Sequence, residues 1–419
     1  MPEAKTGCRF CGEPIEHVFV DLGLSPLCES FVKAEDLNRG ERFYPLKVWV
    51  CGACKLVQLQ EYVAADAIFD DYAYFSSFSD SWLKHAADYC EMVTERFGLG
   101  ADSFVVEIAS NDGYLLKNFV QTDVPCLGVE PSWTVAEAAK DVGVESLVQF
   151  FGRDTATQLA AQRGQADLIL GNNVLAHVPD LNDFVGGMVP LLAAGGVVTM
   201  EFPHLMRLVE QVQYDTIYHE HFSYLSLLTT QRIFAAHGLE LFDVQELPSH
   251  GGSLRVFAQH AGGPQPVTER VDALLERERA AGYDGLEVYL DFPAKVEASK
   301  RELLRFLIDA KEAGQRVVAY GAPGKGNTLL NYCGIRTDLV EYAVDRNPYK
   351  HGRYTPGTHI PIHPPERLEQ DDPAYVLILP WNLAREISKQ LAPMTARGVR
   401  LVVPIPTLTP LEETTAVAQ

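Results

Sequence analysis

The chain has 419 residues, of which 47% are hydrophobic, and it carries a formal net charge of -21. This length predicts two or three domains with full hydrophobic cores, and the acidic balance argues against a surface for nucleic acid or anionic membranes. There is no run of 18 apolar residues, and the polar residues 1–6 precede no apolar signal region. We therefore expect a cytoplasmic protein without a membrane partner, whose eight cysteines are reduced thiols or metal ligands.

Two CxxC pairs mark the first segment, residues 1–65, as a metal-binding domain. Cys8 and Cys11 form one pair, and Cys51 and Cys54 form the other. Each pair puts two thiolates on a tight turn, and two pairs complete a tetrahedral zinc site. A single pair would fit redox chemistry as well, but the matched pairs favour zinc. Four thiolates leave no open position for a nucleophilic water, so we expect the zinc to be structural.

The second segment, residues 66–250, contains a strand, a loop of small residues and a helix start over residues 104–116. The loop carries Glu107, Ser110, Asn111 and Gly113, and it reads ExxSNxG rather than GxGxxG. A dinucleotide pyrophosphate needs those glycines so that the backbone can approach it. This loop is too substituted and too acidic for such a ligand, whereas a cationic sulfonium suits it better.

Further polar residues follow the next strands of this segment. Glu130 ends the second strand, where a carboxylate can accept hydrogen bonds from the hydroxyls of a nucleoside ribose. Asn172, Asn173 and His177 follow a later strand, and a Gly-Gly pair leads into another. This order is typical of methyltransferases that use S-adenosylmethionine. A dehydrogenase or epimerase would require the glycine fingerprint that this chain lacks here.

The stretch from residue 214 to 224 is dense in groups that transfer protons. It contains Tyr218, His219, Glu220, His221 and Tyr224. A general base, its orienting partner and donors to a developing oxyanion all come from these residue types. The alternative is a loop whose histidines and tyrosines cap neighbouring backbone.

An aromatic and hydroxyl-rich stretch with Tyr72, Ser76 and Ser77 precedes a predicted helix over residues 80–97. For this stretch, core packing and a ligand wall remain equally open.

The third segment, residues 251–419, repeats the strand-loop-helix pattern and predicts a second Rossmann-like domain. Lys325 lies in a loop of small residues at a helix N-terminus, a place that favours anions. Lys350 and Arg353 add local positive charge to an acidic protein. We expect a diphosphate near these three residues, although ordinary surface charge would explain any one of them.

Seven motifs together give the chain a family resemblance. They are the paired CxxC start, Tyr72-x-x-x-Ser76-Ser77, Glu107-Ile-Ala-Ser-Asn-Asp-Gly113, Asn172-Asn173-x-x-x-His177, Tyr218-His-Glu-His221, His250-Gly-Gly-Ser-Leu-Arg255 and Tyr320-Gly-Ala-x-x-Lys325-Gly. Over nearly its whole length the chain resembles the sugar C-methyltransferases of antibiotic and surface-polysaccharide pathways. That family acts on dTDP-linked 4-keto deoxysugars.

The resemblance implies an α/β protein of three domains that binds structural zinc, S-adenosylmethionine and a nucleotide sugar. A class I Rossmann-like methyltransferase domain would lie between the N-terminal four-Cys zinc-binding domain and the C-terminal Rossmann-like α/β domain. The C-terminal domain would hold part of the nucleotide sugar. By resemblance, Tyr72, His177, Tyr218, Glu220 and His221 occupy the positions of the family's active-site residues.

The expected chemistry is methylation at carbon 3 of a 4-ketosugar through an enolate. We expect His221 to remove the proton, with Glu220 fixing its tautomer, and Tyr218, Tyr72 or His177 to hydrogen-bond the enolate oxygen. The residues assigned to cofactor binding are Glu107, Ser110, Asn111, Gly113, Glu130, Asn172 and Asn173, and those assigned to the substrate are Ser76, Ser77, His219, Tyr224, Lys325, Lys350 and Arg353.

Several alternatives remain at this point. The enzyme could act on another ketosugar or at another carbon. A metallohydrolase would need the HExxH spacing in place of His-Glu-His, and a zinc-ribbon RNA methyltransferase would need a basic stripe. A protein that only binds a nucleotide sugar or S-adenosylmethionine would not need the His-Glu-His run. The sequence sets no oligomeric state and is compatible with a monomer.

Overall fold

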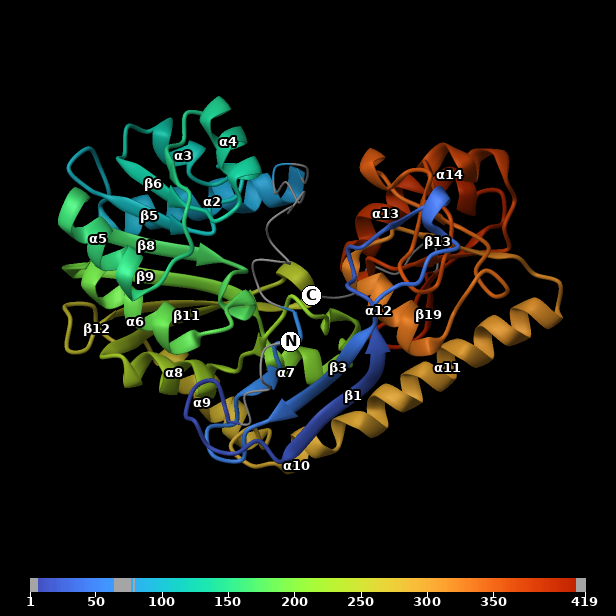
Figure 1. Ribbon diagram of the computed structural model, residues 1–419, viewed down its shortest axis with the longest axis horizontal. Coiled ribbons are helices and arrows are strands. Elements are labelled where there is room, and N and C mark those ends of the chain that lie inside the picture. Colours follow the sequence, from blue (N-terminus) through green and yellow to red (C-terminus); the bar gives the residue numbers. More distant parts are fainter. Residues whose placement is uncertain (1–6, 64–76, 78–79, 412–419) are drawn as a thin grey trace.

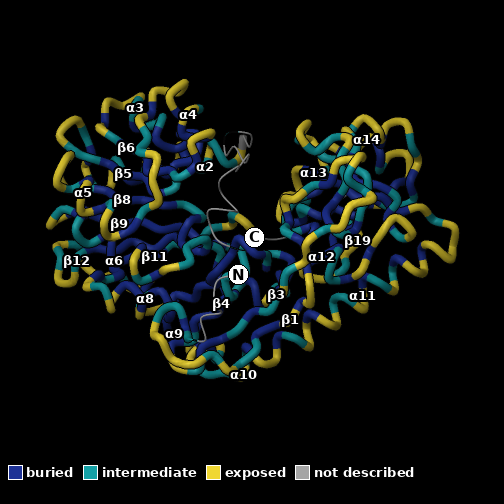
Figure 2. Tube along the Cα trace, viewed as in Figure 1, coloured by how far each residue is buried: buried dark blue, intermediate teal, exposed yellow. Residues whose placement is uncertain are grey.

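A computed structural model describes residues 7–63, 77 and 80–411 of the chain. Two α/β lobes lie side by side, and the N-terminal strands and a long helix lie beneath them (Figure 1). Buried strands form the centre of each lobe, while the helices expose their outer faces (Figure 2). No helix among the described residues is long and apolar enough to cross a membrane.

The N-terminal segment forms most of a four-stranded antiparallel sheet in the order β1-β3-β4-β10. Its strands are β1 (His17–Ser25), β3 (Tyr44–Val50), β4 (Val57–Leu59) and β10 (Ser223–Tyr224). Buried residues alternate with less buried ones along β3, and Leu46, Val48 and Val50 all face the core. The last strand, β10, comes from the middle of the chain and begins two residues after His221.

The first lobe contains a seven-stranded sheet in the order β11-β12-β9-β8-β5-β6-β7. Strand β12 runs opposite to the other six strands of this sheet. The strands are β5 (Val105–Ile108), β6 (Cys126–Val129), β7 (Ser146–Leu147), β8 (Ala166–Asn172), β9 (Leu192–Pro203), β11 (Leu239–Leu247) and β12 (Ser253–His260). Every residue of β5 is buried, as expected for a strand covered on both faces. The predicted division after residue 250 falls between β11 and β12, two paired strands of this one sheet.

Helices cover this sheet and connect its parallel strands. They are α2 (Asp80–Phe97), α3 (Lys117–Val120), α4 (Trp133–Asp141), α5 (Arg153–Arg163), α6 (Leu181–Leu191), α7 (Leu205–Glu210), α8 (Leu227–Ala236) and α9 (Glu269–Ala280). Three 3-10 turns of this lobe contain polar residues: η3 (Leu175–His177), η4 (Tyr214–Thr216) and η5 (Ser249–Gly251). Ligands of open parallel sheets bind beyond the carboxyl ends of the strands, and residues 109–113 and 173–177 follow the ends of β5 and β8.

The second lobe has a six-stranded sheet in the order β16-β14-β13-β17-β18-β19. Its first five strands are parallel, and β19, which the sequence analysis did not predict, closes the sheet antiparallel. The strands are β13 (Val317–Tyr320), β14 (Ala343–Val344), β16 (Ile362–His363), β17 (Tyr375–Ile378), β18 (Arg400–Val403) and β19 (Thr409–Leu411). The helices and turns are α12 (Gly324–Cys333), α13 (Ala384–Gln390), α14 (Ala392–Thr395), η6 (Pro348–Lys350), η7 (Pro365–Gln370) and η8 (Trp381–Leu383). The second Rossmann-like sheet is therefore present as predicted.

Two further contacts join the N-terminal segment to the rest of the molecule. Helices α10 (Glu287–Leu290) and α11 (Phe292–Glu312) pack on β1, where the rings of Phe19 and Phe292 stack at 4.6 Å. In the second lobe, β15 (Arg353–Tyr354) pairs with β2 (Val32–Lys33), which precedes η1 (Ala34–Asp36). The N-terminal segment is thus packed against both lobes.

Candidate active site and metal centre

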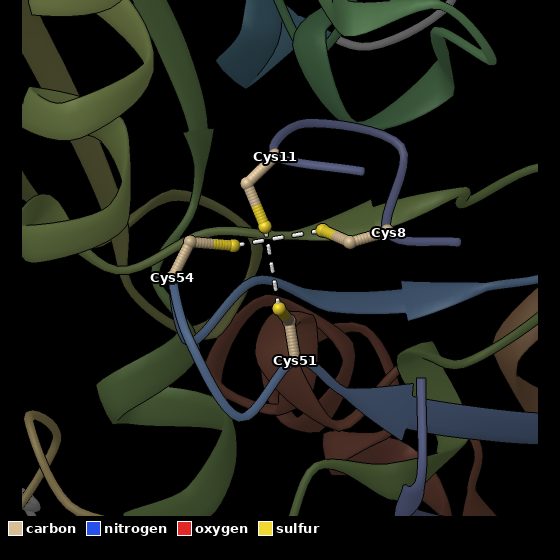
Figure 3. A group of neighbouring side chains, drawn as sticks. All are labelled: Cys8, Cys11, Cys51 and Cys54. Carbon is tan, nitrogen blue, oxygen red and sulfur yellow. Dashed lines mark hydrogen bonds between the residues drawn. The ribbon is translucent and has the colours of Figure 1, made fainter. Parts of the chain in front are cut away.

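The four predicted zinc ligands converge on one point. The sulfur atoms of Cys8, Cys11, Cys51 and Cys54 lie within 4.8 Å of one another, and Figure 3 shows them directed at a common centre. A tetrahedral zinc with sulfur at about 2.3 Å requires sulfurs roughly 4 Å apart, and the Cys8–Cys54 and Cys11–Cys51 distances are 3.5 Å. The residues present therefore fit a zinc ion that has no position left for water.

Turns and a neighbouring amide hold this cluster in shape. The amide of Gly12 donates to the Cys8 carbonyl at 2.9 Å, and its φ of 78° is readily available to glycine. Gln58 donates to the Cys8 sulfur at 3.2 Å and accepts from the Arg9 amide at 2.9 Å. Such partners around a metal site orient its ligands, so a side chain on β4, the strand after the second knuckle, fixes the first knuckle.

Strand β5 leads into residues 109–113, the donor loop, and the strand itself contains a buried acid that has no hydrogen-bond partner among the described residues. Both carboxylate oxygens of Glu107 are buried without a hydrogen bond, and burial, then the charges of Glu130 and Asp112, raises the pKa of Glu107. Buried polar groups of this kind need a partner. The amino and hydroxyl groups of a bound S-adenosylmethionine would donate hydrogen bonds, so this buried acceptor fits that cofactor.

The other predicted cofactor residues surround the same loop. Glu130 Oε2 accepts from the Asn111 amide at 3.0 Å, so the acid at the end of β6 fixes the loop after β5. The Ser110 hydroxyl lies beside Gly128, where an added Cβ would be only 2.1 Å away. Ser77 donates its backbone amide to Asp112 at 3.1 Å, which places that predicted substrate residue against the donor loop. Tyr72 and Ser76 lie outside the described residues.

Two of the predicted catalytic residues, Tyr218 and His177, and the predicted substrate residue Tyr224 form a ring cluster around His221. Its ring centre lies 4.1 Å from that of Tyr218, 4.7 Å from that of His177 and 6.1 Å from that of Tyr224. His177 comes from η3 after β8, and the amide of Phe222 donates to the carbonyl of Ala176 at 2.8 Å, which connects the two loops. The cluster therefore lies at the carboxyl edge of the seven-stranded sheet.

The tautomer of His221 is set by a backbone carbonyl. Its Nδ1 donates to the Thr216 carbonyl at 2.8 Å, which leaves Nε2 as the unprotonated nitrogen. Burial, with the adjacent His177, keeps the pKa of His221 well below its usual value. The neutral, proton-accepting ring is therefore the stable form at neutral pH.

The expectation that Glu220 would hold the His221 ring is wrong. Glu220 Oε1 accepts from the Cys28 thiol at 3.6 Å, and among the described residues it makes no hydrogen bond to His221. Side chains at consecutive loop positions point in different directions, so the Thr216 carbonyl takes the role instead. His219 also points away, since its Nε2 donates to the Pro45 carbonyl at 3.2 Å on β3.

Replacing Glu220 by glutamine is expected to change the pH dependence of stability. Burial, then the charge of Glu29, raises the pKa of Glu220 to about 7. The native state therefore keeps a proton that the unfolded chain has released, and ionisation of Glu220 destabilises the fold as pH rises toward 7. Glu220→Gln should gain up to about 3 kcal/mol over the wild type between pH 5 and pH 8.

Urea unfolding of both proteins at several pH values measures this gain. Glu95→Gln, which changes an exposed carboxylate on α2, is the matched control and should show no such trend. Parallel pH curves for Glu220→Gln and the wild type would contradict the assignment.

The predicted diphosphate residues have internal partners. Lys350 donates to the Ala322 carbonyl at 2.9 Å and lies 3.7 Å from the Glu29 carboxylate. Lys325 donates to Asn382 and lies 4.2 Å above the ring of Trp381, and burial lowers the pKa of Lys325 to about 8. These two lysines border the loop after β13. Arg353 lies on β15 opposite Lys33 in the two-stranded ribbon.

No sequence pattern marked the loop that carries Cys28 and Glu29 as part of the site. It lies between Glu220 and the start of α12, where a Cβ on Gly324 would be 2.9 Å from the Cys28 sulfur and 3.0 Å from Glu29 Oε1. Trp381 of the second lobe donates to the buried Asp215 at 2.7 Å. Contacts between residues so far apart in the sequence leave no local pattern. A second constrained turn follows β11, and there the sequence does give a signal, because Gly251 and Gly252 follow His250.

Three family models match successive parts of the chain. Residues 8–69 match a putative zinc binding domain, residues 82–244 a methyltransferase domain, and residues 248–406 a C-methyltransferase C-terminal domain. The C-methyltransferase NovU of Streptomyces niveus is 36% identical over 402 residues, which are 95% of each chain.

Solved structures give weaker likenesses. An S-adenosylmethionine-dependent methyltransferase of Clostridium acetobutylicum is 13% identical, with a TM-score of 0.36 over 47% of this chain and 97% of that one. The DhpI–SAH complex is 20% identical, with a TM-score of 0.32 over 44% and 91% of the two chains. These scores carry no argument beyond the family models and NovU. On the strength of that full-length match, the chain belongs to the zinc-binding, S-adenosylmethionine-dependent C-methyltransferases.

Proposed function

We propose that this enzyme methylates carbon 3 of a dTDP-linked 4-keto deoxysugar through an enolate. The observation that carries the proposal is His221, whose Nε2 is left unprotonated by the Nδ1 bond to Thr216. A carbon becomes nucleophilic only when a neighbouring carbonyl can hold the charge, so a C-methyltransferase needs a base and a donor to the developing oxyanion.

The side chains around His221 supply these two functions in the proposal. His221 Nε2 removes the carbon 3 proton, and Tyr218 and His177 lie close enough to the same ring to donate to the oxygen at carbon 4. Because the site disfavours an isolated imidazolium, the proton moves most readily when the enolate charge forms beside it. Bound S-adenosylmethionine supplies the electrophilic methyl group.

The nucleotide part of the substrate is assigned to the second lobe. Lys325 and Lys350 at the loop after β13 provide positive charge in a chain whose net charge is -21. A diphosphate would exchange the present contacts of these ammonium groups for charge-assisted hydrogen bonds. Lys350 lies beside Glu29, and the adjacent Cys28 contacts Glu220, the residue before His221. A sugar attached to a diphosphate at Lys350 would therefore lie toward His221.

Incubation with a dTDP-linked 4-keto-6-deoxyhexose in deuterated water tests both halves of the proposal. With S-adenosylmethionine, the product should gain the mass of one methylene at carbon 3. Without it, the carbon 3 hydrogen should exchange for deuterium, because enolate formation needs only the base. Methylation at oxygen, or the absence of product with dTDP-linked and GDP-linked ketosugars alike, would refute the proposal.

A further inference from the structure

The turn that connects β11 and β12 carries His250, a third histidine at the carboxyl edge of the seven-stranded sheet, besides His177 and His221. Since β11 runs parallel to the neighbouring parallel strands, η5 at its end lies where such sheets bind ligands. The side chain of His250 is exposed there. Its ring meets that of Trp82 edge-on, with centres 5.1 Å apart and planes at 82°.

The backbone of His250 adopts a conformation that most residues with a side chain avoid. Its φ and ψ are 55° and 21°, in the left-handed region, and Gly251 and Gly252 follow with φ of 88° and 117°. A side-chain residue in this region is strained and persists only where the surroundings fix it. Strained backbone of this kind is concentrated at ligand sites.

Buried groups from other elements fix the turn. The Ser249 hydroxyl donates to Glu201 at 2.8 Å, and Gln213 donates to the Gly251 carbonyl at 2.7 Å. A Cβ on Gly251 would lie 2.5 Å from the ring of Trp381, so the turn packs directly against the second lobe. The position of His250 is thus set from both lobes.

Glu201, which accepts the hydrogen bond from Ser249, is itself held by two further side chains. It is fully buried, accepts from Arg255 at 2.6 Å, and its Oε2 lies 2.8 Å from His85 Nε2. Burial alone would raise the pKa of Glu201, but the hydrogen bond from His85 and the charge of Arg255 lower it to about 2. Glu201 is therefore ionised at every physiological pH.

His250 lies near groups of the proposed acceptor site. Gly251, the next residue, packs on the ring of Trp381, and Lys325 lies 4.2 Å above that same ring. Burial first, and the charge of His250 as a smaller cause, lowers the pKa of both His177 and His221. We propose that His250 is an acceptor-binding residue whose ring hydrogen-bonds an oxygen of the ketosugar between the His177–His221 pair and Lys325. This inference rests on the proposed function. Imidazole suits the role because it offers one donor and one acceptor nitrogen.

Replacing His250 by glycine tests the inference without straining the fold. Glycine adopts the left-handed conformation freely, so the variant should keep the wild-type unfolding temperature. Loss of one hydrogen bond should raise KM for a dTDP-linked 4-keto-6-deoxyhexose about tenfold. The Kd of S-adenosylmethionine, measured by calorimetry, should not change. His250→Asn, which tolerates this backbone and retains a donor, should recover part of the loss.

Asp123→Gly is the matched control, because Asp123 has a φ of 57° and lies exposed before β6, at the amino edge of the sheet. It should retain wild-type KM. Wild-type turnover of the ketosugar is measured alongside, and its absence would overturn the proposed function and this inference with it. With wild-type turnover present, an unchanged KM for His250→Gly overturns this inference alone. A matching loss of affinity for S-adenosylmethionine overturns it too, since it would place His250 on the donor side.

Discussion

Replacing Cys51 by serine, or removing zinc with a chelator, is expected to lower the unfolding temperature by roughly 10 °C or more and to abolish turnover. Structural zinc contributes on the order of 10 kcal/mol to small folds, and loss of one thiolate removes much of that. The effect should reach the active site because Cys51 and Cys54 flank the turn between β3 and β4. Tyr224 of β10, three residues after His221, pairs with Val57 of β4.

Thermal unfolding followed by circular dichroism, together with the zinc content of the purified protein, measures this outcome. Cys126→Ser is the matched control, since this half-buried thiol on β6 is remote from the cluster and should keep one zinc per chain. An equimolar zinc content and an unchanged unfolding temperature in Cys51→Ser would show that the four sulfurs do not hold a structural ion.

Replacing His221 by asparagine is expected to lower turnover about a hundred- to ten-thousand-fold while binding of S-adenosylmethionine persists. Asparagine can still donate to the Thr216 carbonyl, but it has no basic nitrogen at the Nε2 position. Deuterium exchange at carbon 3 of the ketosugar should fall by the same factor, because it depends on the same proton transfer. Calorimetry with S-adenosylmethionine separates loss of the base from loss of the donor site.

His260→Asn provides the comparison for this experiment. His260 is another histidine of this lobe, and its ring donates to the Leu192 carbonyl. It lies at the far end of β12 from the turn that carries His250. The variant should turn over at the wild-type rate. If His221→Asn retained full exchange and turnover, the proton would have to be removed by another group, and Glu220 would become the first candidate.

Local sequence patterns predicted the parts of this enzyme that are built locally. The paired CxxC spacing is sufficient to define the four-sulfur cluster, because each knuckle is a single turn. Helix α2 begins and ends at the predicted residues 80 and 97. Strands such as β5 and β13, all of whose residues are buried, were equally visible as short apolar runs.

Contacts that depend on tertiary folding were not predictable in the same way. The partner of His221 is a backbone carbonyl, and every residue has one, so no residue type marks Thr216 for the role. The Cys28 thiol meets Glu220 across 192 positions. The two-residue strands β10 and β15 have too few residues to show any periodicity. His219 was assigned to the substrate by its neighbours in the sequence, whereas the direction of its side chain places it against β3.

The placement of β10 and β15 bears on how such enzymes can be recombined. A chimera that exchanges only the first 65 residues between two homologues would join β4 and β2 to foreign strand partners at Ser223–Tyr224 and Arg353–Tyr354. A viable exchange must carry those short segments as well. The metal-binding segment should therefore be exchanged together with the strands that pair with it, and not as an independent module.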